Sequence, residues 1–275
     1  MSKICITLST LDPAAVTMLK YFKEMGFSES ARTGILCRDN LLLMPIERLI
    51  VPEEEYQTPK EPDPYPVDYD ILAKELDISY YVVASRHWSI SGQPSLTVHA
   101  TGNFGKAIFG GRNRELQYIV PNPMRNVFMA LQVDPPLGFQ VSLEATHHSP
   151  TQFETPMFFA EVGSSLTQWV DEGVCGYLVK SILKGIESTE KAKIAIGFGG
   201  GHYCPKFSVM EREHAFGHIA AKYALPELTE ELVGQMIVKT KGKIEKAFIE
   251  DGVKGVDRRK VESILNELEL ELERI

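Results

Sequence analysis

The sequence predicts an α/β protein with a three-layer α/β/α arrangement around a mixed, largely parallel sheet. Two observations lead to this prediction. A strand-like segment at 3–8 is followed by an amphipathic helix and then by further strands, which is a β-α-β opening. Short apolar runs then continue to alternate with helical patterns along the 275 residues. This length fits a single α/β catalytic domain over 1–275, with or without a smaller lobe.

The first helix is expected over 13–25. Asp12 is a favourable N-cap, the proline after it suits the first helical position, and Gly26 ends a run of apolar residues at helical spacing. Strands at 34–37 and 41–46 follow, separated by a turn. This order of elements places the helix against the sheet.

Five prolines among acidic residues mark 52–67, a composition that opposes both helix formation and strand pairing. An extended surface crossing is expected there. A short helix at 68–76 and a buried strand at 80–84 follow, and the end of that strand delivers residues 85–88 into a loop. The next strand, 96–99, leads into a second loop that is rich in small residues.

The remaining elements are predicted from apolar periodicity, capping residues and glycines. They are a helix at 122–131, strands at 139–145 and 157–162, a long helix at 166–185 after a capping box, a strand at 193–196, and helices at 228–238 and from Asp257 onward. If 210–225 is also helical, His214 and His218 would share one face of it. Ala215 occupies the place of the glutamate in HExxH, so that zinc-protease motif is absent.

The composition is that of an ordinary globular protein, with 44% hydrophobic and 24% charged residues. We expect no membrane span, because no run of 18 apolar residues occurs, and no signal peptide, because residues 1–9 lack a basic start followed by a long apolar block. The four cysteines are far apart and form no CxxC pair, which favours a cytoplasmic protein with free thiols. A net charge of −8 argues against a general nucleic-acid coat protein, but permits specific RNA binding through a local basic patch.

The segment KIAIGFGGGHYCPKF, residues 193–207, is the most informative stretch. A strand is predicted to deliver His202 from a bare loop of three glycines, where a ligand can approach backbone N–H groups closely. A tight turn with a packed histidine is the alternative. Five of the seven histidines follow strands in this way: His87, His99, His147, His148 and His202. Since ligands bind beyond the carboxyl ends of strands in open α/β sheets, these imidazoles are predicted to converge on one cleft.

Such a cluster suits the hydrolysis of an acyl bond in two ways. Imidazoles and Glu144 could hold a divalent transition metal, with zinc as the expected ion, that activates water. Alternatively, one histidine is a general base while N–H groups of the glycines stabilise the oxyanion. No GxSxG elbow is present, Ser149 precedes a proline, and Cys204 is more typical of a packed thiol than of a nucleophile. Walker and GxGxxG phosphate motifs are absent.

Three motifs carry a resemblance to a known family. They are SRHWSISGQPSLTVHATGNFG at 85–105, EATHHSPT at 144–151 and GFGGGHYCPKF at 197–207. Together they resemble the archaeal and plant type of D-aminoacyl-tRNA deacylase, and the similarity extends over essentially the whole chain. Ser149 and Cys204 replace a glycine and an alanine of the family pattern, which are changes between small residues.

The resemblance implies an enzyme that cleaves the ester between a D-amino acid and the terminal ribose of tRNA. It also implies zinc dependence, tRNA as the partner, and a phosphorylase-like or peptidyl-tRNA-hydrolase-like α/β fold. A zinc-dependent amidohydrolase or peptidase acting on a small acyl-amino acid is one alternative. An RNA- or nucleotide-binding module without activity is another. No membrane or protein partner is implied, and a monomer is expected.

Residue roles follow as hypotheses. The catalytic candidates are Glu144, His147, His148 and His202. The substrate-binding candidates are His99, Thr101, Asn103, Gly199, Gly200, Gly201, Tyr203 and Lys206. The metal-ligand candidates are His87, His99, His147, His148 and His202. Phosphates of the acceptor stem would contact Lys106, Arg112, Arg114, Lys206 or the basic stretch 239–246.

Overall fold

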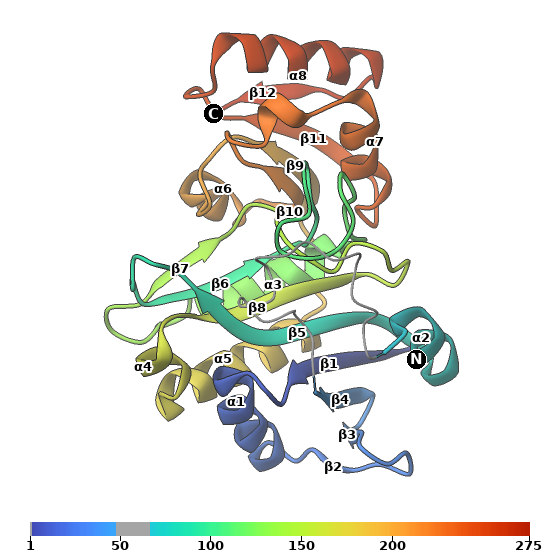
Figure 1. Cartoon of the computed structure of the whole chain (residues 1–275), viewed down its shortest axis with the longest axis vertical. Coiled ribbons are helices and arrows are strands. Elements are labelled where there is room, and N and C mark those ends of the chain that lie inside the picture. Colours follow the sequence, from blue (N-terminus) through green and yellow to red (C-terminus); the bar gives the residue numbers. More distant parts are fainter. Residues whose placement is uncertain (1, 48–66) are drawn as a thin grey trace.

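The computed structural model describes residues 2–47 and 67–275, and this part of the chain forms two sheets (Figure 1). The larger sheet has eight strands and is mixed. In spatial order they are β2 (Ser28–Glu29), β3 (Leu36–Arg38), β4 (Leu41–Ile46), β1 (Lys3–Ser9), β5 (Ile78–Trp88), β8 (Met157–Ser164), β6 (Ser95–His99) and β7 (Gln140–Leu143). The central strands β4, β1, β5 and β8 are parallel, whereas β6 runs antiparallel to β8. The predicted mixed, largely parallel α/β class is confirmed.

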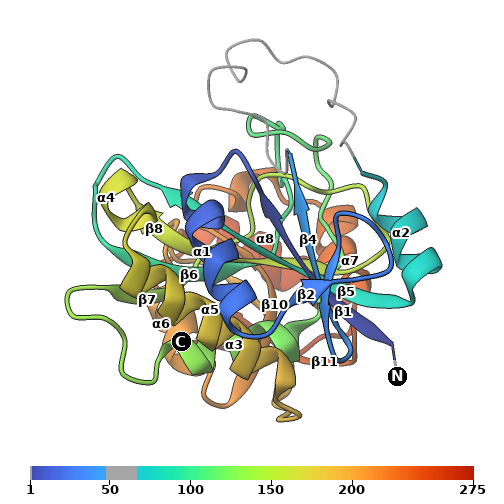
Figure 2. The same cartoon turned by 90° about the horizontal axis from the view of Figure 1, so that it is seen from below.

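Helices cover one face of the large sheet, and Figure 2 shows them from that side. They are α1 (Pro13–Glu24), α3 (Pro121–Leu131), α4 (Leu166–Trp169) and α5 (Glu172–Glu187). The side chain of Asp12 accepts hydrogen bonds from the N–H groups of Ala14 and Ala15, so it caps α1 as predicted. Alternate strand residues such as Val82 and Phe158 point into the main hydrophobic core against these helices.

The opposite face of the large sheet is apolar in one part and polar in another. Beneath α2 (Tyr69–Leu76) it is apolar, with Tyr81 and Phe159 in a second core cluster. Further along β5 the same face carries Ser85 and then His87, because side chains two residues apart share a face. The fold therefore offers a buried polar surface near the β6 side of the sheet.

The second sheet has four parallel strands and lies beyond the β7 side of the first (Figure 1). Its order is β10 (His214–Ala220), β9 (Lys193–Phe198), β11 (Ile244–Ile249) and β12 (Leu272–Arg274). One face packs against α7 (Glu230–Val238) and α8 (Gly255–Glu267). The other includes Phe216 and Phe248, which belong to the main core together with Phe207 of α6 (Pro205–Met210). A 3-10 turn spans Leu225–Glu227.

Several predicted boundaries differ from the structure. Residues 85–88 are not a loop, because β5 continues to Trp88 in register with β8. The long helix at 166–185 is two helices, and Asp171 caps the second by accepting from the N–H group of Val174. Helix α8 begins at Gly255 after Lys254, so Asp257 lies in its first turn instead of capping it. The helix expected at 122–131 begins one residue earlier, and the strand at 139–145 is reduced to β7.

The conditional helix over 210–225 is wrong. Residues His214 to Ala220 form β10, whose main chain pairs with β9. A four-residue spacing places two side chains on one face of a helix or of a strand, so the histidine spacing could not distinguish the two. The proline crossing predicted at 52–67 lies, except for Val67, outside the described residues.

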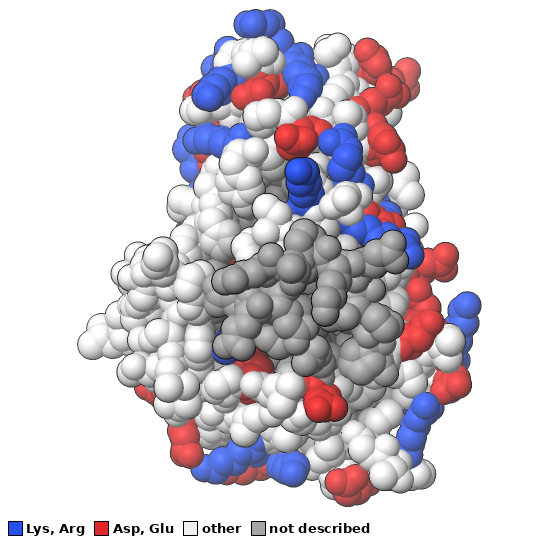
Figure 3. Space-filling view, in the orientation of Figure 1, with Lys and Arg blue, Asp and Glu red and all other residues white. Residues whose placement is uncertain are grey.

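The surface has an uneven charge distribution. Figure 3 shows Lys and Arg interspersed with Asp and Glu over the four-stranded sheet and its helices, while the side formed by the β6, β7 and α4 region is largely uncharged. In the part of the chain that the structure describes, no helix combines the length and the apolar character needed to cross a bilayer.

Candidate active site and metal centre

The five strand-end histidines lie in one cluster over the polar face of the large sheet. His87 on β5, Glu161 on β8 and His99 on β6 stand on adjacent strands, because Ser85 and Thr97 both pair with Glu161. The loop after β7 brings Glu144, His147 and His148, and the loop after β9 brings His202. Two isolated bridges, between Thr101 and His147 and between Glu144 and Tyr203, join these loops.

The expected location beyond the carboxyl edge of one sheet is wrong. Strand β6 is antiparallel to β8, so its end at His99 pairs with Phe159, inside β8, instead of meeting the end of that strand. The imidazoles consequently gather over the face of the large sheet, where the second sheet adjoins it. Strand direction cannot be read from the local sequence, which explains the error.

Glu144 is at the centre of the cluster and is 2% exposed. Its Oε2 atom lies 3.2 Å from Nε2 of His202, 3.5 Å from Nε2 of His147 and 4.0 Å from Nε2 of His99. Its Oε1 atom lies 3.1 Å from Nδ1 of His87. Neither oxygen has a hydrogen bond of good geometry in the described structure.

Glu161 is a member of the cluster that the sequence reasoning missed. Its Oε2 atom lies 3.5 Å from Nδ1 of His87 and 3.6 Å from Nε2 of His99, and Oε1 accepts a hydrogen bond of 2.6 Å from the hydroxyl of Ser85. The signal was present in the sequence. A single carboxylate inside the apolar strand MFFAEVGS must be paired when it is buried, and such residues are frequently functional.

Three imidazoles carry a proton on Nδ1. In His99, His147 and His148 the Nδ1 atom lies 3.1, 2.8 and 2.5 Å, respectively, from a main-chain carbonyl oxygen within two residues, and a carbonyl can only accept. The Nε2 atoms of His147 and His148 keep their lone pairs, whereas burial of His99 is outweighed by the carboxylates of Glu161 and Glu144, which raise the pKa of His99. The rings pack closely, with centroids 4.4 Å apart for His99 and His147 and 4.4 Å apart for His147 and His148.

Burial and charge divide the cluster into a neutral and an ionised part. Burial and the neighbouring imidazoles hold the pKa of His147 well below its usual value, and the same causes lower the pKa of His148 to about 4. Burial also opposes protonation of His87, but the carboxylates of Glu144 and Glu161 outweigh it and raise the pKa of His87 to about 10. The pKa of Glu161 is lowered, because the hydrogen bonds and charges of the imidazoles outweigh its burial.

The donor atoms fit a divalent cation. Three groups have ligand atoms within 4.8 Å of one another: His99, His147 and His148; His87, Glu144 and His202; and His99, Glu144 and Glu161. The buried Nε2 atom of His99 and both oxygens of Glu144 have no hydrogen-bond partner in the described structure, and a cation would satisfy them. Histidines whose other nitrogen is bonded to a carbonyl are typical of metal ligands.

Two predicted substrate-binding side chains are engaged with the main chain. The hydroxyl of Thr101 donates to the carbonyl of Pro150 at 2.7 Å. The amide of Asn103 donates to the carbonyls of Gly110 and Arg112 at 2.9 and 3.2 Å. His99 is fully buried within the cluster. These contacts hold the loops around the site, and the substrate roles of the three residues stay predictions.

Among the three glycines of the loop, one backbone N–H group is available to bind a ligand. The N–H groups of Gly199 and Gly201 donate to the carbonyls of Ala220 and Tyr203 at 2.8 and 3.3 Å. Among the described residues, the N–H group of Gly200 has no such partner. A Cβ atom on Gly199 would lie 2.8 Å from the side chain of Glu250, so this loop packs directly on that residue.

The structure shows the contacts of Tyr203 and Lys206, two predicted substrate-binding residues, and of Cys204. The hydroxyl of Tyr203 lies 2.9 Å from Nε2 of His87, and Lys206 donates from Nζ to the carbonyl of Ile275 at 3.0 Å. Cys204 is fully buried, and burial raises the pKa of its thiol. A buried, protonated thiol does not act as a nucleophile, in agreement with the packed role expected for it.

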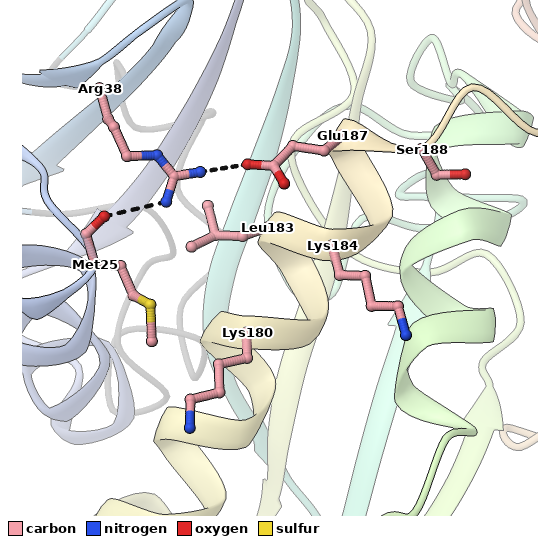
Figure 4. A pocket seen from close by; sticks show the side chains of 7 residues that line it. All are labelled: Met25, Arg38, Lys180, Leu183, Lys184, Glu187 and Ser188. Carbon is pink, nitrogen blue, oxygen red and sulfur yellow. Dashed lines mark hydrogen bonds and ion pairs between the residues drawn. The ribbon is translucent and has the colours of Figure 1, made fainter.

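The other histidines and a separate pocket lie apart from the cluster. His218 is buried against the hydroxyl of Thr146, and His214 packs on the ring of Phe248. A surface pocket of about 360 Å³ lies between α5 and the end of α1 (Figure 4). Its lining residues are Met25, Arg38, Lys180, Leu183, Lys184, Glu187 and Ser188. None of them was predicted to act in the site.

Comparisons with known proteins agree with the cluster. A model of the family described as D-aminoacyl-tRNA deacylase matches residues 74–273. The D-aminoacyl-tRNA deacylase of Thermococcus onnurineus is 36% identical over 280 residues, which cover 98% of each chain. That of Pyrococcus furiosus is 36% identical over 212 residues, which cover 74% of this chain and 78% of the relative. The crystal structure of the conserved protein of unknown function AF0625 has a TM-score of 0.86 at 24% identity, covers 99% of this chain and 95% of its own, and supports the fold alone. The chain therefore belongs to the D-aminoacyl-tRNA deacylase family.

Proposed function

We propose that this protein hydrolyses the ester bond between a D-amino acid and the terminal ribose of tRNA. The observation that carries the proposal is the buried carboxylate of Glu144, which lies within 3.5 Å of the imidazoles of His87, His147 and His202. A buried, ionised carboxylate that orients several imidazoles is suited to activating water at an acyl carbon. The names of the related proteins indicate the substrate.

Zinc is the cation that we propose for the site. The Nε2 atoms of His99, His147 and His148 would hold it, with oxygens of Glu144 and Glu161 nearby. Nitrogen and carboxylate ligands of this kind are typical of zinc. When bound, such an ion supplies Lewis acidity, which lowers the pKa of a water molecule and polarises the ester carbonyl.

His202 is the general base in this proposal. Its side chain is 39% exposed, compared with 20% for His147, 4% for His87 and none for His99, so among these four it is the imidazole most open to substrate. Its Nε2 atom faces Oε2 of Glu144 at 3.2 Å, which orients the ring and leaves Nδ1 to accept the proton of the attacking water. The N–H group of Gly200 is available to the developing oxyanion.

The acceptor stem would contact the basic side chains of the 106–114 loop. Arg112 and Arg114 are 60% and 39% exposed and lie 3.5 and 3.6 Å from their carboxylate partners. Lys239 is 15% exposed and donates to the carbonyl of Leu116 at 2.6 Å, which favours a structural role. Binding of tRNA is therefore expected to weaken as salt rises, by about tenfold or more between 50 and 200 mM. This substrate fits a cytoplasmic location.

Single-turnover deacylation of D-tyrosyl-tRNA tests the function. We expect the His202→Ala and His147→Ala variants to lose at least about a hundredfold in rate, because general-base and metal-ligand groups contribute that much. His214→Ala is the matched control, since His214 lies outside the cluster. Rates within about threefold of the unmodified protein would contradict the assigned roles. Equal turnover of a D-amino-acid ester without RNA, or of an N-acyl-D-amino acid, would favour the amidohydrolase alternative.

A further inference from the structure

The four-stranded sheet has a topological switch point between β9 and β11. The chain passes from β9 to β10 on one side and then crosses to β11 on the other side of β9. The loops that leave the carboxyl ends of β9 and β11 therefore diverge, and ligands characteristically bind in the crevice at such a point. Here these loops are Gly199 to His202 and Glu250 to Gly252. The first of them carries the proposed general base.

Lys222 spans this switch point. It follows β10, and its N–H group donates to the carbonyl of Gly200 at 3.1 Å. Its Nζ atom lies 2.9 Å from Oε2 of Glu250, and a Cβ atom on Gly252 would lie 2.9 Å from the same Nζ atom. The side chain thus reaches from the end of β10, past the end of β9, to the end of β11.

The ion pair with Glu250 fixes the position of the Lys222 ammonium group and leaves some of its N–H donors free. Glu250 is 7% exposed at its side chain, whereas the side chain of Lys222 is 44% exposed. An ammonium group has three N–H donors, and the carboxylate uses one of them. Lysine is a common ligand of phosphate, and a fixed position lowers the entropy lost when it binds.

The glycine loop connects the Lys222–Glu250 ion pair to His202, the proposed general base. Gly199 and Gly200 have φ angles of +129° and +76°, and a Cβ atom on Gly199 would collide with Glu250. Only one residue separates Gly200 from His202, so the two lie at most roughly 7 Å apart along the chain. In an aminoacylated tRNA, the phosphate of the terminal nucleotide is separated from the ester by a single ribose.

We propose that Lys222 binds the 5′-phosphate of the terminal nucleotide while the ester at the 3′ end of the same nucleotide lies beside His202. This inference rests on the proposed function, and it assigns the lysine to substrate recognition instead of to chemistry. Glu250 directs the ammonium group, and the glycine loop lets the nucleotide approach the main chain.

The test uses two substrates that differ by one phosphate: the D-tyrosyl ester of adenosine and that of adenosine 5′-monophosphate. For the unmodified, metal-loaded protein we expect KM to be about tenfold lower for the phosphorylated ester, which is the effect of about one charge-assisted hydrogen bond. Lys222→Met should raise this KM to that of the unphosphorylated ester and leave the latter unchanged. Lys222→Arg should keep most of the difference.

Lys246→Met is the matched control, because Lys246 is also ion-paired, lies on β11 of the same sheet and belongs to neither loop. It should preserve the phosphate effect. Two results would overturn the inference: an unmodified protein that does not distinguish the esters, or a Lys222→Met variant that slows both equally, as loss of a purely structural pair would. The first of these needs no variant. Failure of the proposed function would differ, because D-tyrosyl-tRNA would then remain intact whether or not the two esters react.

Discussion

A single carboxylate inside an apolar strand illustrates how the site is built at the scale of one residue. Glu161 is buried on β8 and would be costly there without partners, yet it has a hydroxyl donor in Ser85 and two imidazoles within 3.6 Å. Its position fixes which nitrogens of His87 and His99 face the interior. The residue thus acts on the geometry of the whole cluster.

Replacing this carboxylate by an amide is expected to weaken metal binding. Glu161→Gln retains the shape and an oxygen that can accept from Ser85, but it removes the negative charge. We expect zinc affinity to fall by about ten- to a hundredfold, as is usual when a group supporting metal ligands is changed. Competition with a chromogenic chelator measures this. Glu211→Gln, another fully buried glutamate that lies outside the cluster, should leave the affinity unchanged; equal affinities for all three proteins would refute the assignment.

His218 makes stability depend on pH. Burial and the charge of Lys239 lower its pKa from 6.5 to about 3 in the folded protein. Its folded pKa lies below the unfolded one, so the unfolded chain binds the proton first, and the stability contribution present above pH 6.5 is lost as the pH falls toward 3. His218→Gln removes this contribution. Between pH 6 and 5, the free energy of unfolding should fall by about 1 kcal/mol less in the variant.

Urea unfolding at pH 7, 6 and 5 measures the difference, with a chelator present so that loss of metal does not contribute. The other imidazoles are the same in both proteins and cancel in the comparison. Parallel pH dependence of the two proteins would show that His218 is protonated in the folded state.

At the scale of the element, the packing around a helix decides whether a glycine in it can be replaced by a larger residue. Gly185 of α5 faces α3 so closely that a Cβ atom would lie 2.4 Å from Cα of Val127. Gly234 of α7 has no atom within 4 Å of such a position. The two glycines occupy similar helical backbones, and only their neighbours differ.

Alanine is therefore expected to have opposite effects at these two positions. Gly234→Ala should stabilise the protein by about 0.5–1 kcal/mol through helix propensity. Gly185→Ala should destabilise it by about 1–3 kcal/mol, because main-chain atoms of α3 would have to move. Chemical denaturation of both variants provides the comparison. A gain in stability at Gly185 would mean that α3 and α5 are less tightly packed than described.

The elements also show how far the sequence could predict the structure. Capping by Asp12 and the strand before the triple glycine could be read locally, because caps and glycines act through neighbouring residues. The sequence also predicted that His147 and His202 lie in one cluster of histidines, because both follow strands. The antiparallel direction of β6 and the strand at His214 were not predictable, since both depend on which distant strand pairs with them. Glu161 was missed because its neighbours predict only a buried strand.

At the scale of the whole molecule, the two sheets share one core and one site. The main hydrophobic cluster contains Val82 of the large sheet and Phe216 of the small one. His99 comes from the first sheet and His202 from the loop after β9 of the second. We therefore propose that 1–275 is one cooperative domain, in which a metal bound at the junction stabilises both parts.

Thermal unfolding with and without zinc tests this. Trp88 and Trp169 report on the large-sheet half by fluorescence, and circular dichroism reports on the whole chain. We expect the two signals to change at the same temperature, and zinc at a hundred times its Kd to add about 2.7 kcal/mol, which raises Tm by about 5 °C. His147→Ala should remove most of the shift. Separate transitions for the two signals would indicate two independent domains.

The central place of β9 between β10 and β11 has a consequence for biosynthesis. A ribosome completes β9 and the loop with His202 before it has made either neighbouring strand, so the small sheet on which this loop stands is still incomplete when His202 emerges. The first 190 residues contain the proposed metal ligands but not His202, the proposed general base. We therefore expect hydrolytic competence to arise late in translation, after β11 has emerged, so that the nascent enzyme spares the aminoacylated tRNAs around it.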